Sequence, residues 1–267
     1  MNISIRLETP EDYRAVEELT REAFWGCMDH PTCDGEHLLV HKLRNVPAYV
    51  PELDFVAETD GKIVGNVIYS RAKIVADNGQ ETEVLIFGPL SVLPDYQKKG
   101  VGSALMRHSI ARARELGYRA IFLYGHPDYY PRFGFKRGKS YGITNPQGKS
   151  PDSLMAMELY DGALDGISGK FYEDEVFDMT PEEIEQFDRK FPPKAPVQLL
   201  PLDVLSGKLS AAVFQALAEH NIKYVASLQR YSGAELLSWE GVGEAGLAEI
   251  NHCLEELGYP KKMFPSS

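Results

Sequence analysis

An apolar segment that leads through a glycine-containing turn into a helix constrains the fold of this chain more than any other feature. Residues 84–92 are rich in apolar side chains and end before Pro94, which is typical of a buried strand. Residues 102–116 carry apolar side chains at helical spacing and are followed by Gly117, a residue type that commonly ends helices. This strand–turn–helix unit predicts a mixed α/β domain.

The turn between the strand and the helix has the chemistry of a phosphate site. Its sequence is Gln97-Lys98-Lys99-Gly100-Val101-Gly102-Ser103. Backbone N–H groups at a helix start lack acceptors within the helix, and with the helix dipole they stabilise a phosphate. The formal net charge of the chain is -11, so Lys98 and Lys99 would supply the positive field that an anionic ligand needs. Judged on its two glycines alone, a plain solvent-exposed turn is an equal alternative.

The remaining periodicity divides the chain into a mixed part and a helical part. Further strands are expected at residues 3–7, 54–58, 63–76, 120–124, 140–144 and 154–159, and further helices at residues 9–24 and 36–43. Helical patterns prevail from Thr180 onward, after which residues 191–196 are proline-rich and four helical stretches begin near Ser210, Tyr224, Ser232 and Gly243. We predict an α/β domain over residues 1–178, a helix and proline-rich linker over 179–200, and a small all-α domain over 201–267.

A second motif, Tyr130-Pro131-Arg132-Phe133-Gly134-Phe135, follows the strand expected at residues 120–124. With Gln97, Gly100 and Gly102, it makes residues 1–178 resemble the GNAT superfamily of acyl-CoA-dependent N-acyltransferases. That family has Gln/Arg-x-x-Gly-x-Gly/Ala after its fourth strand and often Tyr-x-x-Phe-Gly-Phe after its fifth. Residues 155–177 also look like the end of one bacterial branch of acetyltransferases. The resemblance implies a mixed, mostly antiparallel central sheet flanked by helices.

The resemblance also implies an acetyl-CoA site, with acetyl-CoA as the cosubstrate. The glycine turn would hold the pyrophosphate, and the pantetheine arm would pair with the fourth strand where it leaves the fifth at a bulge. The residues expected to bind acetyl-CoA are Leu90, Ser91, Val92, Gln97, Lys98, Lys99, Gly100, Val101, Gly102 and Ser103. Among them, the N–H of Val92 is expected to polarise the thioester carbonyl.

Tyr130 is the expected catalytic residue. It matches the tyrosine that many family members use as the acid for the departing thiolate. A phenol has a pKa of about 10 and is still protonated at neutral pH, so it can donate to sulfur. Aromatic packing against Phe133 and Phe135 is the alternative role of this side chain.

The general base is left open by the sequence. The titratable candidates near the expected acceptor site are His126, Glu36, His37, Asp54 and Glu58, and for each of them a solvated surface role is the alternative. A metal site would draw on Cys27, His30, Cys33 and His37, but their spacing matches no zinc arrangement, and we expect no metal. No cysteine has the sequence context of a nucleophile, which argues against a covalent acyl-enzyme.

The C-terminal part resembles the C-terminal domain of the bacterial RNA polymerase alpha subunit, a helix-hairpin-helix fold. The matching segments are 221–225, 233–237, 241–243, 247–250 and 257–258. Where that family has DNA-contacting arginine, lysine and serine, this chain has Ala212, Ala245 and Gly246. Residues 196–267 hold five lysine and arginine residues against eight acidic residues, a balance of -3 that disfavours DNA. We therefore expect a protein partner or self-association rather than DNA binding.

Together these patterns predict an N-acetyltransferase in which a primary amine, on a small molecule or a protein, attacks acetyl-CoA directly. The alternative is an acetyl-CoA-binding regulatory protein whose helical domain contacts the transcription machinery or another protein. The sequence contains no apolar run of the roughly 18 residues that a membrane span needs, and no secretory signal is visible. Its three cysteines suit no disulfide framework, so we expect a cytoplasmic protein without membrane contact.

Overall fold

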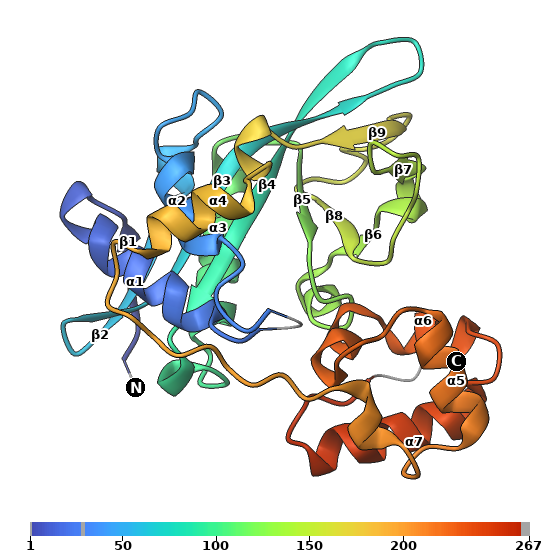
Figure 1. The fold of residues 1–267 in the computed structure, drawn as a ribbon. Coiled ribbons are helices and arrows are strands. Elements are labelled where there is room, and N and C mark those ends of the chain that lie inside the picture. The colour runs from blue at the N-terminus through green and yellow to red at the C-terminus, as the bar shows by residue number, and fades with distance from the viewer. Residues whose placement is uncertain (1, 28–29, 263–267) are drawn as a thin grey trace.

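The computed structural model describes residues 2–27 and 30–262, and its N-terminal part is a mixed sheet with helices on both faces (Figure 1). The strands are β1 (Ser4–Leu7), β2 (Phe55–Thr59), β3 (Lys62–Val75), β4 (Glu81–Val92), β5 (Ala120–Tyr124), β6 (Lys136–Arg137), β7 (Ile143–Thr144), β8 (Leu154–Glu158) and β9 (Gly169–Tyr172). Their order is β1-β2-β3-β4-β5-β8-β6, and β9 pairs with β3 and β7. Only the β4–β5 and β7–β9 pairs are parallel among the described strands, which confirms a mostly antiparallel sheet.

Local sequence explains the central hairpin. Asp60 and Gly61 join β2 to β3, and both have positive φ angles of 51° and 74°. A two-residue turn of this kind matches the right-handed twist of the flanking strands, and glycine adopts it at no steric cost.

Three helices cover the sheet: α1 (Tyr13–Phe24) and α2 (Glu36–Leu43) on one face and α3 (Val101–Glu115) on the other. The alternation of β3 follows from this arrangement. Val67 and Tyr69 pack in the cluster that contains Leu105 of α3, whereas Ile68 packs with Val40 of α2. Each such buried apolar side chain stabilises the fold by about 2 kcal/mol.

Strand β4 changes its pairing half-way along. The register with β3 shifts between Val67 and Tyr69, so that Gly88 and Pro89 together oppose Ile68, which is a bulge. Within the described residues, β4 pairs with β5 only at Leu85 and Ile86. Beyond Ile86 the two strands diverge, and this edge of β4 is left without a strand partner.

Helix α4 (Pro181–Asp188) and the segment after it lie against α1 and α2. Thr180 and Glu183 form the predicted capping box at its start. Arg21 of α1 pairs with Asp188 at 2.6 Å and also donates to the carbonyl of Pro192. Residues 192–200 have no helix or strand, but they are attached to α1 and the loop after it. Trp25 donates to the carbonyl of Ala195, and the N–H of Val197 donates to the carbonyl of Pro31.

Residues 201–262, called here the C-terminal helical region, lie apart from the sheet (Figure 1) and build their own apolar cluster. Its elements are the 3₁₀ segments Leu202–Leu205 and Val225–Arg230 and the helices α5 (Ala211–Glu219), α6 (Gly233–Ser238) and α7 (Gly243–Glu256). The turn from α6 to α7 approaches α5 so closely that a Cβ on Gly241 would lie 3.1 Å from the Ala212 carbonyl oxygen. The domain division and the resemblance to the RNA polymerase subunit stay predictions.

Two short strands were not expected, and one expected strand is mostly 3₁₀ turn. Residues Gly138–Tyr141 form a 3₁₀ turn and only Ile143–Thr144 pair as a strand. β6 has two residues, and β9 starts at Gly169, whose φ is 141°, beside the carbonyl of Val75. Such short strands form because longer strands offer them partners, which no local pattern reveals.

In the described part of the chain, no helix is long and apolar enough to cross a membrane.

Candidate active site

The glycine turn presents backbone N–H groups at the start of α3. Gln97 is held in place by its side-chain amide, which donates to the carbonyl of Val92 at 3.1 Å. Lys98 and Gly100 have φ angles of 58° and 92°, and Gly100 is the residue that precedes the helix. The first-turn N–H groups have no acceptor within an α helix, so they are available to an anion.

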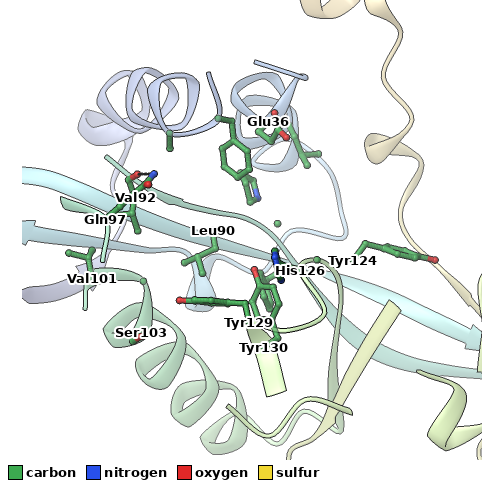
Figure 2. A pocket seen from close by; sticks show the side chains of 18 of the residues that line it. Glu36, Leu90, Val92, Gln97, Val101, Ser103, Tyr124, His126, Tyr129 and Tyr130 are labelled. Carbon is green, nitrogen blue, oxygen red and sulfur yellow. Dashed lines mark hydrogen bonds between the residues drawn. The ribbon is translucent and has the colours of Figure 1, made fainter. Parts of the chain in front are cut away.

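A cavity of about 910 Å³ runs from this turn along the free edge of β4 (Figure 2). Figure 2 shows Gln97, Val101 and Ser103 toward one end, Leu90 in the middle and Tyr124 at the other end. Of the ten residues predicted to bind acetyl-CoA, all except Ser91 and Lys99 line this cavity.

The two exceptions have other neighbours. The Ser91 hydroxyl lies on the opposite side of β4, 3.0 Å from the hydroxyl of Thr20 in α1. Its side chain is therefore outside the cavity wall, and only its backbone is left for a ligand. The ammonium of Lys99 lies 5.7 Å from the centre of the Tyr96 ring, which itself lines the cavity, so Lys99 stands next to the cavity wall without being part of it.

Close contacts of glycines fix the geometry around α3. A Cβ on Gly65 of β3 would lie 2.9 Å from Val101 and 3.0 Å from Leu105, so the absence of a side chain lets α3 approach the sheet. A Cβ on Gly102 would lie 3.5 Å from the Tyr129 hydroxyl. Tyr129 therefore stands directly over the start of the helix.

Tyr130 lines the cavity beside Tyr129 and packs against aromatic rings (Figure 2). Its ring lies 5.7 Å from Phe87 and 5.9 Å from Phe135, so Tyr130 takes part in aromatic packing while it also lines the cavity. Gly125 makes room for it, because a Cβ there would lie 2.5 Å from the Tyr130 ring. Burial, with smaller contributions from the nearby tyrosines, raises the pKa of Tyr130 above its usual value.

His126 also lines the cavity, but both of its ring nitrogens are engaged. Nδ1 accepts from the backbone N–H of Asp128 at 3.2 Å, and Nε2 lies 3.3 Å from the side-chain oxygen of Gln229. Burial and the neighbouring Lys262 ammonium lower the pKa of His126. A histidine with both nitrogens occupied is poorly suited to accept a proton from an acceptor amine.

Two carboxylates line the cavity. Glu36 is the first residue of α2, accepts from the thiol of Cys33 at 3.3 Å, and has its pKa raised by burial. Glu173 follows β9, lines the cavity and is exposed to solvent. Reduced hydration next to the cavity wall, together with the Asp178 carboxylate, raises the pKa of Glu173 to about 7. Sequence reasoning missed Glu173, since the strand before it was not predicted.

Three base candidates lie outside the cavity wall and bind other partners. His37 is fully buried and lies 3.2 Å from Asp188. Asp54 accepts from Tyr49 and Asn66. Glu58 accepts from Arg6 on β1. These three side chains bind partners within the protein and do not line the cavity, which favours the non-catalytic alternative for each of them.

The residues considered for a metal bind different partners. Cys33 donates to Glu36, His37 faces Asp188, and His30 pairs with Asp34 at 2.9 Å. Within residues 2–27 and 30–262, no group of three or more His, Cys, Asp or Glu side chains is arranged to hold a metal ion.

Comparison with known proteins identifies the N-terminal fold. Residues 52–137 match the model of the acetyltransferase (GNAT) domain. The crystal structure of the GNAT family N-acetyltransferase YhbS from Escherichia coli in complex with CoA covers 67% of this chain and 93% of its own, with 27% identity and a TM-score of 0.59. Residues 52–137 are thus identified as an acetyltransferase (GNAT) domain, and the fold around them is similar to that of a GNAT family enzyme. A GNAT family acetyltransferase from Brucella melitensis, solved with acetyl-CoA, is similar to this chain as well, with 29% identity and a TM-score of 0.54.

Curated relatives of the GNAT domain are N-acetyltransferases that are themselves uncharacterised. YjhQ of Escherichia coli K12 is 38% identical over 98 residues, and the chain spans about half of it, 54%. YhbS of the same strain is 28% identical over 166 residues, which are 62% of this chain and 92% of that protein. The matched residues 52–137 include the glycine turn and the free edge of β4, both of which line the cavity.

Proposed function

We propose that the protein is an N-acetyltransferase that transfers the acetyl group of acetyl-CoA to a primary amine by direct attack. One observation carries this proposal: a single cavity connects the α3 start, the free edge of β4 and Tyr130. An extended thioester cofactor needs these three elements in that order. The relatives solved with CoA and with acetyl-CoA support the same cofactor here.

The cofactor is proposed to lie along the cavity with its pyrophosphate on the N–H groups of Gly100 to Ser103. Lys98 faces the same end and adds positive charge. The pantetheine arm would follow Leu90 and Val92, whose β4 edge lacks a strand partner among the described residues. The amide groups of an arm of this kind can replace the missing ladder hydrogen bonds.

The transfer step forms the amide bond and breaks the thioester bond. The neutral amine nitrogen attacks the carbonyl carbon, and the backbone N–H of Val92 stabilises the oxyanion. As the tetrahedral species collapses, Tyr130 donates its phenolic proton to the departing sulfur, which leaves as the thiol of CoA. The raised pKa of Tyr130 suits this role, because the group stays protonated at neutral pH. The amine loses a proton to a base in the cavity, which releases it to solvent, and Tyr130 regains a proton from solvent, so the overall transfer neither takes up nor releases a proton.

We infer that the acceptor is a cationic amine and that a cavity carboxylate takes its proton. Glu36 and Glu173 stand at the acceptor end, and a second positive charge on the substrate would keep them ionised. Of the two, Glu173 has a pKa near neutrality and is solvent-accessible, which suits a proton acceptor.

The C-terminal helical region is proposed to have the helix-hairpin-helix fold of the RNA polymerase alpha C-terminal domain without its DNA-binding function. The turn Gly241-Val242-Gly243 between α6 and α7 supports the fold. Ala212, Ala245 and Gly246 at the family's DNA-contacting positions support the loss of DNA binding. We place the enzyme in the cytoplasm, in keeping with the three cysteines, which are free thiols.

Titration calorimetry and a thiol-release assay test the enzymatic proposal. We expect acetyl-CoA to bind and free CoA to appear with at least one amine in a panel that contains monoamines, polyamines and lysine peptides. Absence of acetyl-CoA binding would contradict the proposal outright. Binding without turnover of any amine would favour the alternative, an acetyl-CoA-binding regulator.

A further inference from the structure

The C-terminal helical region contacts the turn that carries Tyr130. Gln229, from the 3₁₀ segment Val225–Arg230, places its side-chain oxygen 3.3 Å from Nε2 of His126. The amide nitrogen of the same side chain donates to the carbonyl of Pro260 at 3.2 Å. These two bonds fix which end of the Gln229 amide faces the acetyltransferase domain.

Lys262 reaches the same histidine from the end of the described chain. It is 2% exposed, and its ammonium nitrogen lies 3.5 Å from Nε2 of His126. Its backbone is held by Asn251 of α7, which accepts from the Lys262 N–H at 2.6 Å and donates to its carbonyl at 3.0 Å. A buried lysine with its backbone held on both sides has a defined position rather than a solvated one.

A second contact secures the docking a short distance away. Asp152, just before β8, forms ion pairs with Arg137 and Lys139 on its own domain. The hydroxyl of Ser232 donates to Asp152 at 3.1 Å, and Glu235 accepts from the Asp152 N–H at 3.4 Å. Ser232 and Glu235 form the capping box of α6, so the start of that helix is built onto the acetyltransferase domain.

Hydrogen bonding defines the protonation state of His126. Nδ1 accepts from the Asp128 N–H, so the proton of the neutral ring is on Nε2 and is donated to Gln229. The Lys262 ammonium beside Nε2 opposes any second proton. The charged groups that face the ring are Lys262 and Asp128.

His126 organises the turn that leads to Tyr130. Its ring accepts from the N–H of Asp128, and its carbonyl accepts from the N–H of Tyr129 at 3.0 Å. Tyr130, the next residue, begins the 3₁₀ turn Tyr130–Phe133. A shift or rotation of the His126 ring therefore moves the backbone from which the candidate acid extends.

We propose that the C-terminal helical region is a positioning element of the transfer site, in which Gln229 and Lys262 hold the His126 turn and thereby the Tyr130 hydroxyl. This inference rests on the proposed acetyltransferase function. His126 acts through the turn and takes no proton from substrate. The C-terminal region is thus a required part of the active site, and its partner is the catalytic domain of the same chain.

Full-length variants test this role. Gln229→Leu keeps the side-chain size and removes both hydrogen bonds, and we expect kcat to fall about tenfold while the Kd of acetyl-CoA stays within about twofold. Gln229→Glu keeps an acceptor for His126 and should retain more activity. Gln215→Leu is the matched control, because Gln215 is exposed on α5 and bonds to Glu219 on the same helix. Thermal melts should show all three variants folded.

Histidine side-chain NMR supplies a readout that does not depend on turnover. In Lys262→Met the pKa of His126 should rise, because the opposing ammonium is gone; Lys208→Met, on the exposed Lys208–Glu256 pair, should leave it unchanged. In Gln229→Leu the His126 signals should shift and the amides of residues 126–130 should exchange faster with solvent.

The possible outcomes separate the two proposals. If the wild-type chain acetylates no amine, the proposed function fails. The His126 signals and the amide exchange of residues 126–130 then still decide whether Gln229 and Lys262 hold the His126 turn. If the His126 signals are the same in Gln229→Leu and the wild type, the positioning role is wrong whatever the activity. An unchanged kcat despite shifted signals would also overturn it.

Discussion

The two ends of the cavity are built on different principles. The glycine-turn end consists of consecutive residues and offers mainly backbone N–H groups, with one cavity-lining lysine. The other end collects side chains from separate elements: Glu36 from α2, Tyr124 and Tyr130 around β5, and Glu173 after β9. Backbone recognition of a phosphate tolerates changes of side chain, whereas an assembled acceptor end can change its specificity without touching the cofactor site.

Replacing Tyr130, the candidate acid, should give the largest effect on activity. This effect should be confined to the acceptor end of the cavity. Tyr130→Phe removes the proton donor, so we expect kcat to fall about 100-fold with the Kd of acetyl-CoA unchanged. Thiol release and calorimetry measure the two quantities. Tyr160→Phe, at a site that is 50% exposed, is the matched control and should be silent. Unchanged turnover in Tyr130→Phe would show that another group protonates the thiolate.

Adding a side chain at Gly102 in the glycine turn should affect the cofactor end of the cavity alone. Gly102→Val adds methyl groups between the helix start and the Tyr129 hydroxyl, and we expect the Kd of acetyl-CoA to rise at least about tenfold. In Gly102→Ala the added Cβ fits at 3.5 Å, so the increase should be smaller. Equal affinities for both variants in calorimetry would place the cofactor elsewhere.

Glu173→Gln should change the pH profile and the choice of amine. With its pKa at about 7, Glu173 is protonated below neutrality and ionised above it, so kcat/KM should rise as the pH increases through about 7. In Glu173→Gln this rise of kcat/KM with pH should be absent. The KM of amines with a second positive charge should increase about three- to tenfold. Glu175→Gln, an exposed carboxylate outside the cavity, is the control. An identical pH profile in Glu173→Gln would exclude this residue as the base.

The smallest expected effect separates the two lysines of the turn. Lys98→Gln should weaken acetyl-CoA binding about two- to threefold, and less so at high salt, because this side chain lines the cavity. Lys99→Gln should weaken the affinity less, since Lys99 itself does not line the cavity. Equal losses in the two variants would mean that the turn acts through its net charge and not through one side chain.

Local signals predicted much of the fold. Asp60-Gly61 predicted the central hairpin, and the pattern at residues 36–43 predicted the bounds of α2. Thr180 with Glu183 predicted the start of α4. Each of these depends on residues within a few positions of one another, where turn, cap and period rules apply.

The candidate site divides in the same way. The glycine turn and Tyr130 lie in short motifs and could be named from the sequence. Glu173 depends on β9 pairing with β3, and the contact between Gln229 and His126 spans 103 positions. The resemblance placed the regions of His37 and Asp54 near the acceptor site, but it does not specify which way a side chain points, and neither side chain lines the cavity.

The attachment of residues 190–197 to α1 has a mechanical consequence. Helix α1 ends at Ala23 and Phe24 on one wall of the cavity, and the C-terminal helical region is fixed to the opposite wall at His126. The connecting chain is therefore anchored to both walls and passes from one to the other. A motion that separated the two walls would also have to lengthen the span between these anchors, so the connection restrains such a motion.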